Sequence, residues 1–114
     1  MKIVEILLYT LKPDTGHEFH QIMQDMSVPL HRNIGMDVVA YGNSLHAADS
    51  YYLIRVYDSL EHLEISQDEF YRSDAWRNGP REAIIERIMT STKSVVILDN
   101  TTVNTLRRKQ PNQQ

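Results

Sequence analysis

The sequence predicts an α+β protein with a ferredoxin-like βαββαβ order, which folds into an antiparallel four-stranded sheet with its helices on one face. The length of 114 residues suits one domain with a single core. Strand-like segments of β-branched and aromatic residues alternate with segments that carry apolar residues at helical spacing. We therefore expect one domain over residues 1–100, followed by a polar, flexible tail over residues 101–114.

The first third of the chain predicts a strand and a helix. Residues 2–11 are nearly continuously apolar, which is typical of a central strand. Thr15 and Glu18 have the spacing of a capping box and predict the start of a helix. Pro29 is expected to kink or shorten the last turns of this helix before Gly35 ends it.

The rest of the chain predicts a hairpin, two helices and a last strand. Residues 36–43 and 50–57 are rich in strand-forming residues and flank turn residues, which indicates an antiparallel hairpin. Asp58 or Ser59 can cap the next helix, and Pro80 can begin a shorter one. The apolar faces of these helices and the last strand are expected at Leu60, Leu63, Phe70 and Tyr71, at Ile84, Ile85 and Ile88, and at residues 94–98.

The two faces of the predicted sheet differ in composition. Side chains alternate along a strand, so one face carries aliphatic residues and the other a mixture of apolar, charged and aromatic ones. The aliphatic set is Val4, Ile6, Leu8, Ile54 and Val56 beside Tyr52, and the mixed set is Ile3, Glu5, Leu7, Tyr9, Tyr51, Leu53, Arg55 and Tyr57. We expect the helices on the aliphatic face and a second copy of the chain on the mixed face, which is too apolar to remain in water.

Three stretches, TLKPDTGHEFHQIM, SYYLIRVYDSLEHLE and FYRSDAWRNGPREAI, resemble the NIPSNAP family. The resemblance covers most of residues 2–98, and its most specific pieces are residues 57–60, Trp76 and the turn at residues 79–81. It implies a dimeric α+β barrel, in which two ferredoxin-like sheets pack face to face. The wider superfamily includes cofactor-free monooxygenases, small isomerases and haem proteins, so the resemblance specifies a fold more than a chemistry. Asp14 departs from similar members, which often have glycine after the proline.

The candidate ligand-binding residues are Glu5, Tyr9, Tyr41, Tyr51, Arg55, Tyr57 and Trp76. Glu5 and Arg55 are expected on neighbouring strands and on the same face, where they form a structural ion pair or a ligand-recognition pair. Phenols on that face can hold a carbonyl group or pack in an interface. Tyr41 is expected at the mouth of a pocket or in solvent. Trp76 is expected to pack a loop against the body or to form a pocket wall beside an arginine.

The histidines are the other candidates for chemistry. His17 and His20 are spaced to lie together on a helix but lack a third ligand, so we expect them at solvated helix positions, with no metal and no other cofactor. His31 and His46 are the better candidates for proton transfer. A haem ligand, if the protein binds haem, is expected at His31 or His62. The sequence contains no cysteine, no phosphate-binding loop and no hydrolase motif.

These observations favour a homodimeric protein that binds a small apolar or aromatic ligand. The alternatives are a cofactor-independent monooxygenase or isomerase and, third, a haem-binding protein. The net charge of −3 and a single basic cluster at residues 107–109 argue against nucleic acid as a partner. No apolar run reaches the length of a membrane span, and without cysteine or a secretion signal the cytoplasm is the expected location.

Overall fold

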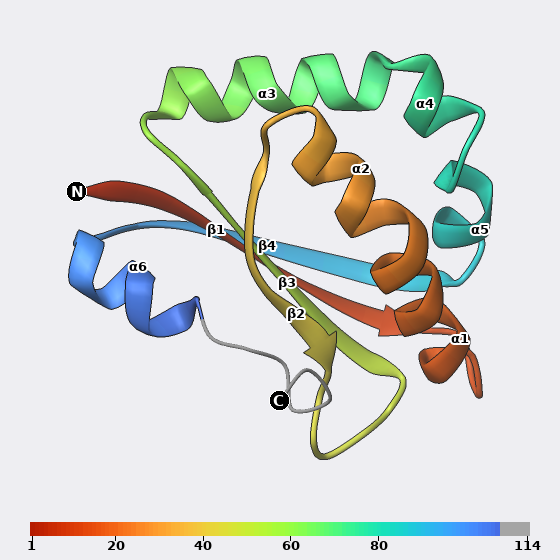
Figure 1. Ribbon diagram of the computed structural model, residues 1–114. Helices are drawn as coiled ribbons and strands as arrows, with labels where there is room; N and C mark the ends of the chain where they lie inside the picture. Colours follow the sequence, from red (N-terminus) through yellow and green to blue (C-terminus); the bar gives the residue numbers. More distant parts are fainter. Residues whose placement is uncertain (108–114) are drawn as a thin grey trace.

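The computed structural model describes residues 1–107, which form a four-stranded antiparallel sheet in the order β2-β3-β1-β4 (Figure 1). The strands are β1 (Lys2–Leu11), β2 (Asp37–Asn43), β3 (Ser50–Tyr57) and β4 (Ile88–Leu98). The helices are α1 (Gly16–Ile22), the π-helical turn η1 (Met23–Ser27), α2 (Val28–Asn33), α3 (Leu60–Arg72), α4 (Asp74–Arg77), α5 (Arg81–Ile85) and α6 (Asn100–Leu106). The predicted α+β class and the ferredoxin-like order of elements are confirmed.

The helices cover the opposite face of the sheet from the one predicted. Leu7 and Leu53, from the mixed set, share one core with Phe19 of α1 and Phe70 of α3. The mixed face can be buried within one chain because the helices bring hydrogen-bonding partners to its charged pair. The aliphatic set therefore faces away from α1–α5, and Leu8 is 54% exposed.

We call this second side the open face. It consists of Val4, Ile6, Leu8 and Thr10 of β1, Tyr52, Ile54 and Val56 of β3, and Thr90, Thr92, Ser94 and Val96 of β4, with neighbouring residues of β2. Figure 1 shows α6 on this side of the sheet, opposite α3. Val103 of α6 packs into a small aliphatic core with Val4 and Val56, so α6 covers one end of the open face.

Helix α6 corrects the expectation of a flexible tail for residues 101–106. Asp99 caps it by accepting a hydrogen bond from the backbone N–H of Thr102 at 2.7 Å, and Val103 is buried. Arg107 then pairs with Asp37 at the start of β2. Val103 and Leu106 are spaced for one face of a helix and follow a capping aspartate. This pattern predicts a short amphipathic helix, but it is easily missed because the segment is mostly polar. The remaining residues of the predicted tail, 108–114, lie outside the described part.

The last strand is longer than predicted. It begins at Ile88, which was expected on a helix, and pairs along its whole length with β1. Between Ile88 and residue 94 the strand is rich in serine and threonine and mostly exposed. An edge strand that neighbours only one other strand has little apolar surface to bury, which explains why residues 88–94 lack the apolar pattern by which a strand is recognised in a sequence.

The first helix starts where predicted but is capped differently. Thr15 Oγ1 donates to the carbonyl of Lys12 at 2.7 Å, and it makes no capping bond to α1. Asp49 instead accepts a hydrogen bond from the backbone N–H of Gly16 at 2.9 Å. A Cβ atom at Gly16 would lie 2.0 Å from the carbonyl oxygen of Ala48, so glycine allows the β2–β3 loop to approach the helix start.

The predicted kink at Pro29 is present as η1, the widened turn that precedes it. Proline lacks an N–H and its ring crowds the carbonyl four residues earlier, and a π-helical turn accommodates both effects. The chain then continues as α2 to Asn33, and Gly35, with a φ of 85°, ends the helix as predicted. This geometry holds His31 within hydrogen-bonding distance of Arg55 on β3.

Candidate functional site

The predicted site residues do not gather in one pocket. They fall into three places, each formed by different elements. These places are a buried polar cluster around Glu5, Arg55 and Tyr57, an aromatic group of Tyr9, Tyr41 and Tyr51 beside His20, and the packing site of Trp76. A separate pocket lies on the open face.

Glu5 and Arg55 form the predicted ion pair, and it is buried. They lie directly opposite each other on β1 and β3, and Arg55 Nε donates to Glu5 Oε1 at 2.7 Å. Tyr57 donates to the same oxygen at 3.2 Å, while Gln67 of α3 donates to Oε2. Burial opposes ionisation of Glu5, but the charge and hydrogen bond of Arg55, with help from Gln67, hold its pKa below the ordinary value. The carboxylate is therefore charged and well satisfied.

His31 completes this cluster from the helix side. Its Nδ1–H donates to the carbonyl of Ser27 at 2.7 Å, and its Nε2 accepts a hydrogen bond from Arg55 Nη1 at 3.0 Å. Burial is the main reason that the pKa of His31 falls to about 4, and the nearby Arg55 charge lowers it further. Both ring nitrogens are engaged, so His31 has no free nitrogen for a haem iron or for proton transfer.

The aromatic group lies between α1 and the sheet. The ring of Phe19 meets Tyr9 and Tyr51 edge-on, at centroid distances of 5.8 and 4.9 Å. The Tyr51 phenol lies 2.7 Å from His20 Nδ1, and Tyr41 is buried with its ring 5.9 Å from the imidazole. Burial lowers the pKa of His20 and raises that of Tyr51, so a neutral phenol donates to a neutral imidazole.

Two expectations about this group are wrong. His20 is only partly exposed and bonded to Tyr51, although we expected a solvated helix position. Tyr41 lies neither in solvent nor at the mouth of a pocket. The pairing of His20 with Tyr51 joins residues 31 positions apart, and no local pattern in the sequence reveals it.

Trp76 has the structural role that we weighed for it. It is buried against Phe70 and Tyr71, with ring centroids 5.2 and 5.4 Å away. Arg77 and Arg81 are exposed, and neither stacks on the indole among the described residues. The indole packs α4 against α3.

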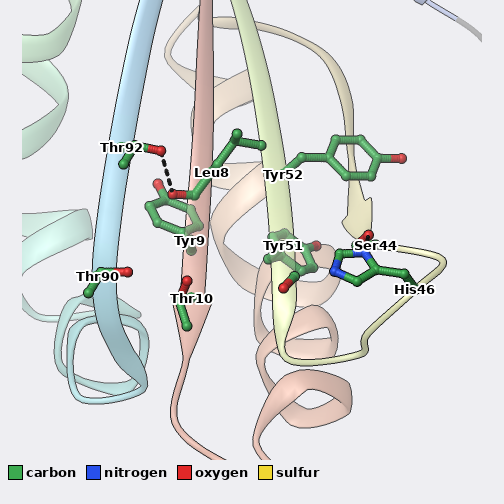
Figure 2. Close-up of a pocket in the computed structure, with 10 residues that line it drawn as sticks. Leu8, Tyr9, Thr10, Ser44, His46, Tyr51, Tyr52, Thr90 and Thr92 are labelled. Atoms are coloured by element: carbon green, nitrogen blue, oxygen red, sulfur yellow. Dashed lines mark hydrogen bonds between the residues drawn. The ribbon is translucent and has the colours of Figure 1, made fainter.

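The open face carries a pocket of 370 Å³ at the end of the sheet away from α6 (Figure 2). In Figure 2, Thr90 and Thr92 of β4 lie to one side, Leu8 and Thr10 of β1 lie in the middle, and Tyr52 lies with the β2–β3 loop on the other side. The lining residues are Leu8, Tyr9, Thr10, Ser44, His46, Ser50, Tyr51, Tyr52, Thr90 and Thr92. The alternation of side chains puts the rings of Tyr9 and Tyr51 beneath the sheet, so these two residues contribute to the floor through their backbone.

Sequence patterns missed this pocket because most of its polar groups come from the edge strand β4 and the β2–β3 loop. His46 Nδ1 lies 2.6 Å from Ser44 Oγ, which leaves Nε2 as the nitrogen available to a ligand. A Cβ atom at Gly42 would lie 3.2 Å from the Tyr52 phenol oxygen, so the glycine leaves room for the Tyr52 ring against β2. The one part of the pocket that the sequence predicted is that Leu8 and Tyr52 lie on the same face of the sheet, which follows from strand alternation.

The other histidines and the acidic residues do not assemble a metal site in the described part. His62 Nδ1 accepts the backbone N–H of Asp58 at 2.9 Å and is exposed. Within residues 1–107, no group of three or more histidine, aspartate and glutamate side chains is placed to hold a metal ion. None of the helices in these residues has the length and apolar character needed to cross a membrane.

Comparison with solved structures relates this fold to known ones. A NIPSNAP-like domain protein from Burkholderia xenovorans, itself uncharacterized, superposes with a TM-score of 0.78 at 17% identity, over 87% of this chain and 86% of that one. A NIPSNAP family protein from Agrobacterium tumefaciens gives 0.79 at 13% identity, over 88% and 95% of the two chains. A candidate antibiotic biosynthesis monooxygenase from Nitrosomonas europaea gives 0.63 at 12% identity, over 82% and 95%.

No protein-family model and no curated protein matches the sequence. The structural likeness to NIPSNAP proteins extends over most of both chains at low identity. The resemblance seen in the sequence is therefore confirmed at the level of the fold, and this chain has the fold of NIPSNAP family proteins.

Proposed function

We propose that the protein is a cytoplasmic homodimer that binds a small apolar or aromatic ligand in the open-face pocket. The observation that carries this proposal is a largely apolar hollow of 370 Å³ on the sheet face that α1–α5 leave bare. The Glu5–Arg55 cluster is a weaker candidate for ligand binding. Its hydrogen-bonding groups are already used by one another, so it serves first as a structural ion pair.

The pocket combines an apolar wall with polar groups at its edge. Leu8 and the Tyr52 ring supply apolar contact, and the hydroxyl groups of Thr10 and Thr90 lie beside them. His46 from the β2–β3 loop adds a hydrogen-bonding nitrogen at the rim. This combination suits a flat ligand that has an apolar ring and one hydroxyl or carbonyl group.

The dimer is proposed on different grounds from those in the sequence. The mixed face is covered by helices of the same chain, so it no longer requires a partner. The open face does, because Leu8 of the inner strand β1 is 54% exposed and α6 covers only the other end of this face. A second copy packed on this face would also close the pocket from solvent.

A titration with 2-naphthol as the probe tests ligand binding. We expect calorimetry to show saturable binding that the Tyr52→Ala variant weakens by about tenfold, since it removes aromatic contact area. Leu45→Ala is the matched control, because Leu45 is fully exposed on the loop beside the pocket. Equal affinity of the wild type and the Tyr52→Ala variant would overturn the proposal.

A cofactor-independent monooxygenase or isomerase is the second candidate. His46 favours it, because an imidazole at the rim of an apolar pocket can accept a proton from a bound phenol. The fold neighbours also include candidate monooxygenases. The test measures the rate of oxygen uptake with 1,4-dihydroxynaphthalene as the substrate. A rate above that of buffer alone, lost in the His46→Gln variant, would support catalysis. Uptake at the buffer rate would leave ligand binding as the function.

A further inference from the structure

A second hollow, a groove of 530 Å³, lies between α3 and β4 on the helix side of the sheet. It exists because α3 leaves β4 bare on this side, where Val95 and Ile97 are 42% and 61% exposed. Its lining residues are Leu63, Glu64, Gln67, Asp68, Tyr71, Arg72 and Lys93. Three of them, Gln67, Tyr71 and Lys93, contact the buried cluster of Glu5 and Arg55.

Lys93 gives the floor of this groove a surplus positive charge. Its ammonium group lies 3.5 Å from Glu5 Oε2, at the limit of hydrogen bonding, and its side chain is half-exposed. Glu5 is already neutralised by Arg55 and hydrogen-bonded by Tyr57 and Gln67. The Lys93 charge is therefore in excess of the one that neutralises Glu5, and Lys93 lines the groove.

Tyr71 supplies a second donor to the same space. Its phenol oxygen accepts a hydrogen bond from Arg55 Nη1 at 2.9 Å, which leaves its own O–H free to donate elsewhere. A phenol that accepts a hydrogen bond from a cation is a stronger donor, because linked hydrogen bonds polarise one another. Lys93 and Tyr71 thus offer an ammonium and a phenol hydrogen where the groove meets the sheet.

The rim limits the charge of a ligand. Asp68 and Arg72 form an ion pair at 3.0 Å, so their charges neutralise each other. The carboxylate of Glu64 is then the unpaired charge among the residues that line the rim. One anionic group can reach Lys93 at the floor, whereas a second would meet the Glu64 carboxylate. Leu63 offers apolar contact for a small body.

We propose that the groove between α3 and β4 is a second ligand site that binds a small monocarboxylate through Lys93 Nζ and the Tyr71 phenol. The site is independent of the open-face pocket, which lies on the other side of the sheet and shares no lining residue with it. A carboxylate there extends the buried hydrogen-bonded cluster outward to the surface.

Benzoate is the probe, followed by ¹H–¹⁵N NMR of the whole chain. We expect saturable shifts at the amides of Gln67, Tyr71 and Lys93, and about tenfold weaker binding in the Lys93→Met variant. Lys12→Met is the matched control, because it removes one exposed positive charge outside the groove and should leave the affinity unchanged. Benzamide, which has the same shape without the charge, should bind about tenfold more weakly than benzoate.

Several results would overturn the proposal. They are shifts that do not saturate, shifts centred on the open face, an unchanged affinity for benzoate in Lys93→Met, and equal binding of benzamide and benzoate. Lys93 is half-exposed on an edge strand, so its substitution does not threaten folding. Failure here would not affect the 2-naphthol titration, which reports on the other face.

Discussion

Arg55 Nη1 donates a hydrogen bond of 3.0 Å to His31 Nε2, and this contact links β3 to α2 inside the core. Arg55 can only donate and the Ser27 carbonyl can only accept, so the proton of the neutral imidazole is on Nδ1. Protonation of Nε2 would place two buried cations against each other. The folded chain therefore requires His31 to be neutral.

The first prediction is a loss of stability in mild acid. The pKa of His31 is about 4 in the folded chain and about 6.5 in an unfolded one, so the unfolded state binds a proton first as the pH falls. The free energy of unfolding should then decrease between pH 6.5 and 4, by about 3 kcal/mol from this group. Urea unfolding at several pH values measures the slope.

The His31→Gln variant is the control for that slope, since glutamine offers an acceptor to Arg55 and does not titrate. The burial of His20 also lowers its pKa, so the His20→Gln variant measures the separate contribution of His20 to the slope. An unchanged slope in the His31→Gln variant would show that the imidazole is not the titrating group.

The second prediction concerns the Glu5–Arg55 pair. Arg55→Met leaves a buried carboxylate without its main partner, and we expect a loss of about 3–5 kcal/mol in the free energy of unfolding. The double variant Glu5→Leu and Arg55→Met removes both charges and should lose less than the single variant. Denaturant unfolding of the two variants measures the difference.

An exposed pair on α3 is the matched control. Asp68 and Arg72 lie 3.0 Å apart with mostly exposed side chains, so Arg72→Met should cost less than about 1 kcal/mol. A loss for Arg55→Met no larger than this would contradict the structural role that we assign to the buried pair.

The third prediction tests the packing of α6 on the open face. Val103→Ala removes apolar contact with Val4 and Val56, and we expect it to cost about 1–2 kcal/mol. Thr105→Ala, at an exposed position of the same helix, should change stability by less than about 0.5 kcal/mol. Equal effects of the two substitutions on the melting temperature would mean that α6 does not dock in solution.

The fourth prediction concerns the dimer. Leu8→Arg places a charge in the part of the open face that α6 leaves uncovered, and we expect light scattering to show a folded monomer where the wild type is a dimer. Leu45→Arg adds the same charge on an exposed loop and should leave the dimer intact. A wild-type monomer at micromolar concentration would end the dimer proposal.

Alternation along the strands predicted the opposition of Glu5 and Arg55, because a parity argument needs only the sequence and the order of the strands. It did not predict which face the helices cover. That choice depends on His31, Gln67 and Tyr71, which reach the pair from helices 16 or more positions away. An ion pair that looks costly to bury thus becomes part of the core once its partners are present.

The pocket was harder to foresee than the fold. Its walls come from three strands and a loop, and its floor is formed partly by backbone of Tyr9 and Tyr51. The two tyrosines were predicted as ligand-binding residues for their phenol groups, which instead lie in the core near Phe19. Alternation in the sequence predicts on which face of the sheet a side chain lies. It does not predict a pocket whose position depends on how much of that face a helix covers.

The most direct test determines on which face of the sheet an apolar aromatic ligand binds. NOEs between bound 2-naphthol and methyl or ring protons distinguish the two faces. We predict contacts to the Leu8 methyl groups and the Tyr52 ring on the open face. Contacts to Leu53 or Phe70, in the core beneath the helices, would contradict the assignment of the ligand site.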